Sequence, residues 1–582
     1  MLDVVIRGGE VIDGTGAERR PADVGIRDGC IAAVAEPGAL ASEGAEREID
    51  AGGCIVAPGF VDLHTHYDAQ AFWDPTLSPS PLHGVTTVVA GNCGFSIAPL
   101  SGDAADGEYL MRMLARVEGM PLESLAEGVP WDWRSTGEYL DRLDGTLAVN
   151  AGFLVGHSAL RRAVMGEAAV GEAATDEQVE AMARLLGDGL TAGGLGFSSS
   201  WATTHSDGAG DPVPSRHATR DELVRLCRVV RDHPGTSLEF IPTVGPFRDE
   251  HAELMADMSL AADRPLNWNV LVAANARSAD DVTQRLAASD VAAARGARVL
   301  ALTVPDLMRI RLCFLTGFLL DTFPGWAKVM TLPAADKLHA LADPEQRRRL
   351  REGIEGPDAG PFARIAQWHR MTIEEAFTPE TKRHEGRLVG DIAAEQGKEP
   401  FDALLDIVIE DGLRTVILPP QSGDDEESWA LRAQTWRDPR VILGASDAGA
   451  HLDFIATFNY TTAFLGDSVR DRGLMALEEA VHLLTDVPAR LYGLKGRGRL
   501  AEGWAADVVV FDPDRIAPGA VGLRADLPAG AARLYSEPEG VEHVLVNGTE
   551  IVSPGATFTP ARPGTLLRSG RDTDTVSLAA GA

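Results

Sequence analysis

Short apolar runs separated by glycine-rich turns occupy the first 58 residues. Val4-Val5-Ile6 precedes Gly8-Gly9, and further short apolar runs follow at 11–12, 24–26 and 31–34. This alternation predicts the hairpins of a small β-sheet. The far end of the chain has the same pattern, at 506–511 and 541–552. Neither end is long enough to complete a sheet alone, so we expect the two ends to pair.

Between the two ends, apolar runs of strand length alternate with longer segments of helical periodicity. Segments 176–190 and 220–232 are examples of the helical pattern. The strand candidates lie at 59–62, 86–89, 151–155, 194–198, 237–241, 267–271, 299–302 and 441–444. Repeated βα units predict the α/β class, and eight of them favour a (β/α)8 TIM barrel over an open sheet.

The same pattern divides the chain into domains. Residues 1–58 and 496–582 are interpreted as the two parts of a small β-sandwich, and residues 59–495 as the barrel. The stretch from about 322 to 398 is polar and rich in arginine. We interpret it as an insertion in the barrel or a lid over it.

The acidic charge balance restricts the possible partners. The chain has 53 Lys+Arg against 86 Asp+Glu, a net charge of −33. Such a charge repels phosphate backbones and anionic membrane surfaces, so we expect a small-molecule substrate rather than nucleic acid or membrane. The basic residues are almost all arginine, and lysine occurs only at positions 328, 337, 382, 398 and 495.

Cysteine usage and hydropathy indicate the compartment. The five cysteines are an odd number and widely spread, which fits a reducing environment. The chain starts directly with a strand pattern, without a basic segment followed by an apolar signal core. The longest apolar run, near 312–320, is too short for a bilayer. We therefore expect a soluble cytoplasmic protein, and a homo-oligomer is compatible with these features.

The strongest local signal for chemistry is His64-Thr65-His66, directly after an apolar strand. Side chains alternate along a strand, so the two imidazoles project from the same face. Barrel active sites gather at the C-terminal strand ends. Two imidazoles in that position can bind one divalent ion. The alternative interpretation is a pair of hydrogen-bonded loop histidines.

Two further segments place candidate ligands after strands. Ser446-Asp447 ends the last apolar strand, where an aspartate can bind a metal and exchange protons with water. An aspartate there is otherwise a helix cap or turn former. Cys93, within Gly91-Asn92-Cys93-Gly94, follows the second strand and is a candidate thiolate ligand or a small buried apolar residue.

Segments spread over nearly the whole chain resemble the amidohydrolase superfamily, in the branch of the N-acyl-D-amino-acid deacylases (D-aminoacylases). They are His64-Thr65-His66, Gly84-Val85-Thr86-Thr87-Val88, Gly91-Asn92-Cys93-Gly94, Val117-Glu118-Gly119-Met120-Pro121, Trp131-Asp132-Trp133, Gly156-His157-Ser158-Ala159-Leu160-Arg161, Ser446-Asp447 and Ala505-Ala506-Asp507-Val508-Val509. The resemblance implies hydrolysis of a C–N amide bond, with an N-acyl-D-amino acid as the leading substrate class.

The same resemblance implies roles for individual residues. His64, His66, Cys93 and Asp447 would form the site of a divalent metal, most simply one zinc ion. Asp447 would also be the general acid/base. His157 would lie at the barrel mouth near the substrate, as a hydrogen-bond donor to the oxyanion.

The chain also departs from the family pattern. No lysine precedes Lys328, so a carboxylated lysine on a middle strand is excluded. The histidines that D-aminoacylases carry on strands five and six are missing, and Glu239 or Asn269 are the replacements available there. The family's His-Pro-Arg segment after the last strand is missing too. Arg470 or Arg472 would then hold the substrate carboxylate, or be solvated loop charges.

Two loop histidines complete the list of candidate site residues. His205, in a Gly/Asp-rich loop, and His451, close behind Asp447, are candidate substrate contacts.

Two alternative functions stay open. The first is a barrel enzyme that acts on a cyclic imide or a lactone, or that catalyses a decarboxylation. The second is a barrel that has lost catalysis and serves as a binding protein.

Overall fold

The computed structural model describes residues 1–356 and 365–578 of the chain. Each of the eight strand candidates of the central region coincides with a buried strand. They are β6 (Phe60–Asp62), β7 (Val85–Ala90), β8 (Asn150–Phe153) with β9 (Val155–Gly156), β10 (Gly196–Ser200), β11 (Ser237–Ile241), β12 (Leu266–Trp268), β13 (Val299–Thr303) and β17 (Val441–Leu443). The apolar runs thus predict these strands to within a few residues.

The central strands are parallel to one another. β6, β7 and β8 form one sheet, and β9 to β13 with β17 form a second one in the order β17-β13-β12-β11-β10-β9. Only Leu154 separates β8 from β9. A parallel bridge between Thr65 and Ala448 joins the segments that follow β6 and β17. The carboxyl ends of all these strands therefore face the same side, where parallel α/β folds place their sites.

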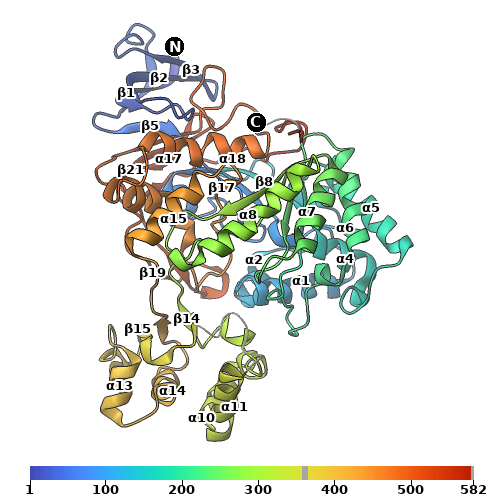
Figure 1. Ribbon diagram of the computed structural model, residues 1–582. Coiled ribbons are helices and arrows are strands. Elements are labelled where there is room, and N and C mark those ends of the chain that lie inside the picture. The colour runs from blue at the N-terminus through green and yellow to red at the C-terminus, as the bar shows by residue number, and fades with distance from the viewer. Residues whose placement is uncertain (357–364, 579–582) are drawn as a thin grey trace.

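Amphipathic helices cover the outside of the second sheet (Figure 1). They are α4 (His157–Met165), α5 (Asp176–Thr191), α6 (Arg220–Arg231), α7 (Asp249–Ala262) and α8 (Ala279–Ala294). In α6 the buried residues Leu223, Leu226, Cys227 and Val230 have the spacing of a single helix face. The Thr219 hydroxyl accepts a hydrogen bond from the Glu222 amide and begins this helix.

Both chain ends join one nine-stranded sheet, as their similar patterns predict. β5 of the N-terminal part pairs antiparallel with β18 of the C-terminal part. The strands are β1 (Leu2–Val11), β2 (Arg20–Arg27), β3 (Cys30–Ala35), β4 (Ala45–Asp50), β5 (Ile55–Pro58), β18 (Val508–Phe511), β21 (Val541–Val546), β22 (Thr549–Ser553) and β23 (Thr557–Phe558). A separate hairpin consists of β19 (Gly522–Arg524) and β20 (Arg533–Tyr535).

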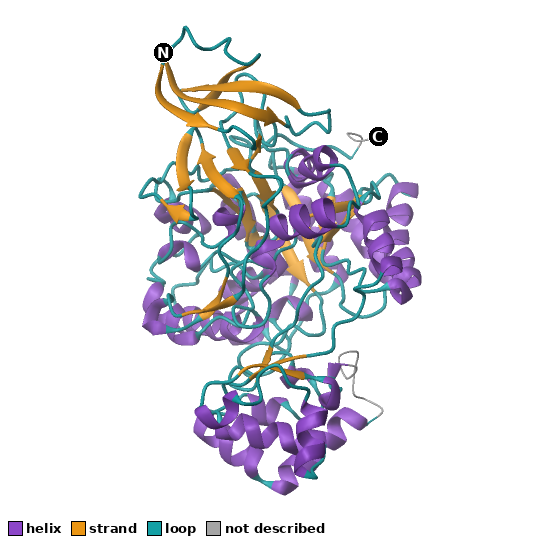
Figure 2. Ribbon diagram, turned by 90° about the vertical axis from the view of Figure 1, so that its left-hand side faces the viewer, coloured by secondary structure: helices purple, strands orange, loops and turns teal. Residues whose placement is uncertain are grey.

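A lobe with its own apolar core projects from the strand ends (Figure 2). A small antiparallel sheet links it to the rest of the molecule, and its core includes Trp326, Trp368 and Phe401, whose rings contact one another. The elements are β14 (Leu312–Cys313), α9 (Ala327–Met330), α10 (Ala334–Ala342), α11 (Pro344–Glu355), β15 (Thr372–Glu375), α12 (Pro379–Lys382), α13 (Val389–Gln396), α14 (Pro400–Glu410) and β16 (Val416–Leu418). The insertion proposed from sequence, 322–398, lies within this lobe, although its residues 357–364 lie outside the described part of the chain.

Further helices are found outside the second sheet and the lobe. They are α1 (Ala104–Val117), α2 (Leu122–Gly128), α3 (Thr136–Leu143), α15 (Glu426–Trp436), α16 (Tyr460–Ala463), the π-helix η11 (Phe464–Asp471), α17 (Leu477–Leu484) and α18 (Asp486–Leu491). Among the described residues, no helix combines the length and the apolar character needed to cross a bilayer.

Candidate metal centre

The two histidines of the His64-Thr65-His66 segment lie buried at the end of β6. Both side chains are 2% exposed, and their ring centroids are 5.2 Å apart. The segment is fixed by its neighbours, because the Thr65 amide donates to the Val89 carbonyl and the His66 amide to the Ala448 carbonyl. Nδ1 of each ring is buried without a hydrogen-bond partner. The strand periodicity predicted that both rings project from the same face of the strand. The hydrogen bonds to β7 and to the segment after β17 hold the two residues in this position.

Cys93 joins the histidines from the loop after β7. Its Sγ lies 3.5 Å from Nε2 of His64. In the described part of the chain, ligand atoms of His64, His66 and Cys93 all lie within 4.8 Å of one another. The backbone of Cys93 is left-handed, with φ 55°. Such a conformation costs a non-glycine residue about 1–3 kcal/mol, and it is found most often where a site needs a side chain in a particular direction.

Asp447 completes the group from the end of β17. Its Oδ1 lies 3.1 Å from Nε2 of His64 and 3.6 Å from Nε2 of His66. Its backbone is also left-handed, with φ 54°. The Asp447 side chain is 29% exposed, whereas both histidines are almost fully covered. Asp447 is therefore the member of the group that faces solvent.

Glu118 is a residue of the centre that the sequence reasoning missed. It follows α1, is buried, and places Oε1 3.6 Å from Nδ1 of His66 and Oε2 3.8 Å from Nε2 of His451. The His451 amide donates to the Glu118 carbonyl as well. The signal available was an acidic residue inside one of the family-like segments, directly after an amphipathic helix.

Glu239 and Asn269 lie side by side behind Cys93. Oε2 of Glu239 accepts a hydrogen bond from the Cys93 amide at 2.8 Å, and the Asn269 amide group donates to Oε1. Oδ1 of Asn269 is buried without a hydrogen-bond partner. Glu239 thus supports the loop that carries Cys93, and both residues stay candidates for metal ligation.

Negative charge accumulates around this group. Five carboxyl groups, those of Asp62, Asp68, Glu118, Glu239 and Asp447, are buried or line the site. In the part of the chain that the structure describes, no Arg or Lys forms an ion pair with any of them. Burial raises the pKa of Glu239 to about 8 and of Asp68 to about 7. These groups are costly to ionise without a nearby cation.

The two ionisable ligands differ in their pKa shifts. Burial raises the pKa of the Cys93 thiol well above its usual range, and Glu239, Glu118 and Asp447 add to this. Burial acts in the same direction on Asp447, but hydrogen bonds from His64 and His66 hold its pKa well below 3.8. Two imidazoles, a thiol and a carboxylate match the donor set of a borderline-soft divalent ion such as zinc. A dication would neutralise the surrounding carboxylates and favour the thiolate.

Comparison with known sequences decides the family. Residues 47–552 match the sequence profile described as "Amidohydrolase family". The chain belongs to the amidohydrolase family. The resemblance inferred from the sequence motifs is thereby confirmed.

Relatives of this amidohydrolase include deacylases. It is 30% identical to the D-aminoacylase of Alcaligenes xylosoxydans xylosoxydans, over 97% of each chain. A crystal structure of D-aminoacylase superposes with a TM-score of 0.64 at 27% identity, covering 98% of this chain and 100% of the other. The N-acyl-D-glutamate deacylase of Bordetella bronchiseptica, solved with zinc and a phosphonate inhibitor, gives 0.62 at 28% identity, with the same coverage. The α/β fold of this amidohydrolase therefore matches that of D-aminoacylase.

His205 and His451, predicted as substrate contacts, both lie beside the centre. The ring of His205 contacts Phe95, with centroids 5.0 Å apart, and its Nδ1 pairs with the Ser200 hydroxyl. His451 contacts Glu118 and packs on Phe318, with centroids 4.5 Å apart. His451 therefore links the centre to the lobe, since Phe318 comes from the lobe segment.

His157 does not take the position expected of it. Both ring nitrogens are already paired, Nδ1 with the Ser199 hydroxyl and Nε2 with Glu222, each at 2.9 Å. Glu222 also accepts two hydrogen bonds from Arg161, and the side chains of His157, Arg161 and Glu222 are all buried. The prediction of an oxyanion donor is corrected here, because His157 has no free N–H and instead joins α4 to β10 and α6.

Arg470 and Arg472 are likewise engaged away from the centre. Arg470 pairs with Asp471 and donates to the Ile516 carbonyl. Arg472 pairs with Asp467 and Asp424, and its guanidinium lies 4.2 Å from the centroid of the Trp429 ring. The prediction that one of them holds the substrate carboxylate is not supported, because both guanidinium groups are used for local ion pairs around η11.

Proposed function

We propose that this amidohydrolase is a metal-dependent deacylase of N-acyl-D-amino acids. The observation that carries the proposal is the convergence of His64, His66, Cys93 and Asp447 at adjoining strand ends. The relatives support the substrate class, since they are named for the deacylation of D-amino acid derivatives. The parallel strands and the Thr65–Ala448 bridge support a closed (β/α)8 barrel as the scaffold.

In this proposal His64, His66, Cys93 and Asp447 hold one zinc ion, with Glu239 and Asn269 as further candidate ligands. Among the described residues, the carboxyl groups around the two histidines form no ion pair with Arg or Lys, and burial raises the pKa of Glu118 well above its usual range; both observations support a resident cation. A zinc ion bound here would lower the pKa of a water molecule and polarise a substrate carbonyl.

Asp447 has the position and charge required of the general acid/base. Its pKa lies well below 3.8, so it is ionised at neutral pH, and its carboxylate is the exposed member of the group. It accepts a proton from the attacking water while the water oxygen bonds to the amide carbon. It then passes this proton to the nitrogen as the C–N bond breaks. The products are a carboxylate and a free amino acid.

His205 and His451 support the substrate in this scheme. Burial lowers the pKa of His205 to about 3 and of His451 to about 4, so both rings are neutral at working pH. A neutral imidazole can donate one hydrogen bond to a carbonyl oxygen without adding a positive charge. This makes them the available donors to the oxyanion, a role for which His157 is not free.

The test combines metal analysis with hydrolysis. Purified protein should contain about one zinc ion per chain and release amino acid from N-acetyl-D-amino acids in preference to the L-forms. The double variant His64→Ala/His66→Ala should lose both the metal and the activity. A variant of the exposed His339, His339→Ala, should keep both. A wild-type protein that takes up no metal on reconstitution would refute the proposal and favour a binding protein.

A further inference from the structure

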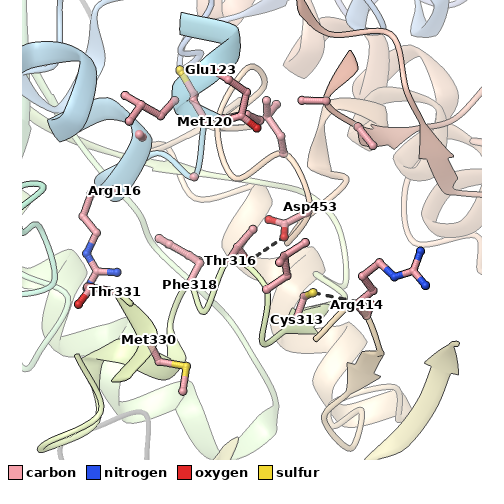
Figure 3. A pocket seen from close by; sticks show the side chains of 18 of the residues that line it. Arg116, Met120, Glu123, Cys313, Thr316, Phe318, Met330, Thr331, Arg414 and Asp453 are labelled. Atoms are coloured by element: carbon pink, nitrogen blue, oxygen red, sulfur yellow. Dashed lines mark hydrogen bonds between the residues drawn. The ribbon is translucent and has the colours of Figure 1, made fainter. Parts of the chain in front are cut away.

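A large cavity lies between the strand ends and the lobe. Its volume is about 750 Å³, within the range of about 300–1,000 Å³ that small-molecule sites occupy. One wall includes residues of α1, α2 and the β19–β20 hairpin, and the other wall includes residues of the lobe, from β14 to β16. Figure 3 shows Met120 and Glu123 on the first wall, and Met330 and Cys313 on the second. In the described part of the chain, the lining includes none of the residues assigned to the metal centre, so a ligand of this cavity binds through a different set of side chains.

Most of the cavity wall is apolar. Its apolar lining residues include Met120, Leu122, Phe318, Met330 and Leu452. The cavity also accounts for three of the seven large hydrophobic side chains that are exposed in the described part of the chain, namely Leu315 (43%), Phe377 (37%) and Leu523 (41%). Exposed apolar side chains gathered around one cavity indicate a binding site for an apolar group.

The charged residues of the lining are mainly positive, in contrast to the protein as a whole. Five cationic residues line the cavity, Arg112, Arg116, Arg311, Lys337 and Arg414, against the two acidic residues Glu123 and Asp453. The chain itself has a net charge of −33. A positive, partly apolar cavity in an acidic protein concentrates small anions.

Two of the five cations are buried and have an N–H group left for a ligand. Lys337, on α10, is 2% exposed and forms no ion pair among the described residues. Its ammonium has three donors and gives two of them to the carbonyls of Phe314 (3.1 Å) and Leu315 (2.8 Å). Arg311 is 7% exposed and pairs with Glu375 at 2.8 Å, but its Nε is buried without a hydrogen-bond partner in the part of the chain that the structure describes.

The unused donors of Lys337 and Arg311 border the same short segment of chain, 311–315, at the start of the lobe. Burial lowers the pKa of Lys337 to about 8, so the ammonium is mostly charged at neutral pH. A buried charge without a counter-charge costs free energy, and a bound anion would offset this cost. The other three cations do not have this property, because Arg112 and Arg116 are in ion pairs and Arg414 is exposed.

We propose that this cavity binds an amphipathic carboxylate, a molecule with an apolar chain and a single carboxylate head group, and that Lys337 holds the head group. The apolar wall accommodates the chain, and the Nε–H group of Arg311 is a second donor at the same segment. Because the two walls belong to different parts of the molecule, the bound chain contacts both and holds the lobe against the strand ends. The site is separate from the metal centre, so the binding does not depend on the proposed deacylase reaction.

Calorimetric titration of the full-length, zinc-loaded protein with octanoate tests the proposal. Octanamide has the same chain without the charge, and acetate has the charge without the chain, so each should bind at least about 10-fold more weakly than octanoate. Lys337→Met should weaken octanoate binding about 10- to 100-fold, the range for one charged hydrogen bond, and leave octanamide binding unchanged. Lys337→Arg should restore part of the affinity. Lys328→Met, at an exposed lysine of the lobe, should bind octanoate like the wild type.

A second variant at the rim of the cavity tests the apolar wall without changing a buried residue. Leu315→Asp should weaken octanoate binding, because it removes an apolar contact and adds a charge that repels the carboxylate. The matched control is Val291→Asp, at a position that is 40% exposed on α8 and outside the lining. It should leave the octanoate affinity unchanged.

The metal-free variant His64→Ala/His66→Ala separates this site from the metal centre. It should bind octanoate like the wild type, whereas loss of binding would place the carboxylate on the metal and overturn the assignment. Equal binding of octanoate and octanamide would overturn it as well, and so would an octanoate affinity that is unchanged in both Lys337→Met and Leu315→Asp. Equal weakening of octanoate and octanamide in Lys337→Met, with a lower thermal midpoint, would show that Lys337 has only a structural role. Absence of hydrolysis of N-acetyl-D-amino acids would refute the deacylase proposal and leave these binding results standing.

Discussion

Oε1 of Glu118 lies 3.6 Å from Nδ1 of His66, on the opposite side of the ring from Asp447. The imidazole is therefore held between two carboxylates, one from the end of α1 and one from the end of β17. A carboxylate behind a metal-binding histidine fixes the ring orientation and increases its basicity. Glu118 is in this sense a positioning residue for the proposed centre.

Glu118→Gln is expected to lower the affinity for zinc about 10- to 100-fold, the usual effect of losing such a partner. The glutamine keeps the size of the side chain and removes the charge that favours Nδ1–H on His66. Competition with a chromophoric chelator measures the affinity. Glu127→Gln, at an exposed position of α2, is the matched control and should bind zinc like the wild type. An unchanged affinity in Glu118→Gln would show that Glu118 does not act on His66.

Cys93→Ser is expected to reduce the selectivity of the centre for zinc. A thiolate favours softer ions, whereas a hydroxyl suits manganese and magnesium better. Zinc affinity should therefore fall much more than manganese affinity, when both are measured by competitive titration. Cys30→Ser, in β3 of the nine-stranded sheet, should alter neither the zinc affinity nor the manganese affinity. If zinc and manganese affinities in Cys93→Ser fall equally, Cys93 is not a ligand.

Gly91→Ala should disturb the loop that carries Cys93. Gly91 has φ +80°, and a Cβ there would lie 2.5 Å from the Leu154 carbonyl oxygen. We expect a loss of zinc binding together with a lower thermal midpoint, since the backbone must shift to relieve the contact. Gly210→Ala has a similar φ of +90° but open space around its Cβ, so it separates the clash from the backbone strain. Full zinc binding in Gly91→Ala would contradict the close packing of this loop.

Glu222→Gln should destabilise the fold by about 3–5 kcal/mol at neutral pH, because it leaves the buried Arg161 without its counter-charge. Burial raises the pKa of Glu222, but hydrogen bonds from His157 and the charges of His157 and Arg161 outweigh it and lower the value to about 2. A depressed folded-state pKa stabilises the protein above the unfolded value of 4.5 and loses this effect as pH falls toward 2.

The difference in urea midpoint between wild type and Glu222→Gln should thus be full at pH 7 and shrink below about pH 4.5. Glu180→Gln breaks the exposed pair with Arg225, which solvent screens, and should leave the urea midpoint nearly unchanged. A difference that stays constant from pH 7 to pH 3 would contradict the ionised Glu222 of this cluster.

Local sequence pattern predicted the central strands and the common face of His64 and His66. Apolar runs located all eight central strands, and the period of two put His64 and His66 on one face. Asp447 and Cys93 were candidates because each comes directly after a strand, and the family resemblance gave both of them the role of metal ligands. These features depend on residues adjacent in sequence, and motif resemblance added the family, which the comparison confirmed.

Contacts between residues distant in sequence decided which of the other predicted site residues are free to act. Whether His157 is free depends on Glu222, 65 residues away, and nothing near His157 in the sequence reveals that contact. Arg470 and Arg472 are taken by carboxylates and a carbonyl around η11, whereas Glu118 reaches the centre only through the packing of α1. A sequence specifies side-chain direction along one strand or helix. Which charges find a partner, and which are left for a ligand, is fixed only when separate elements pack together and exclude water.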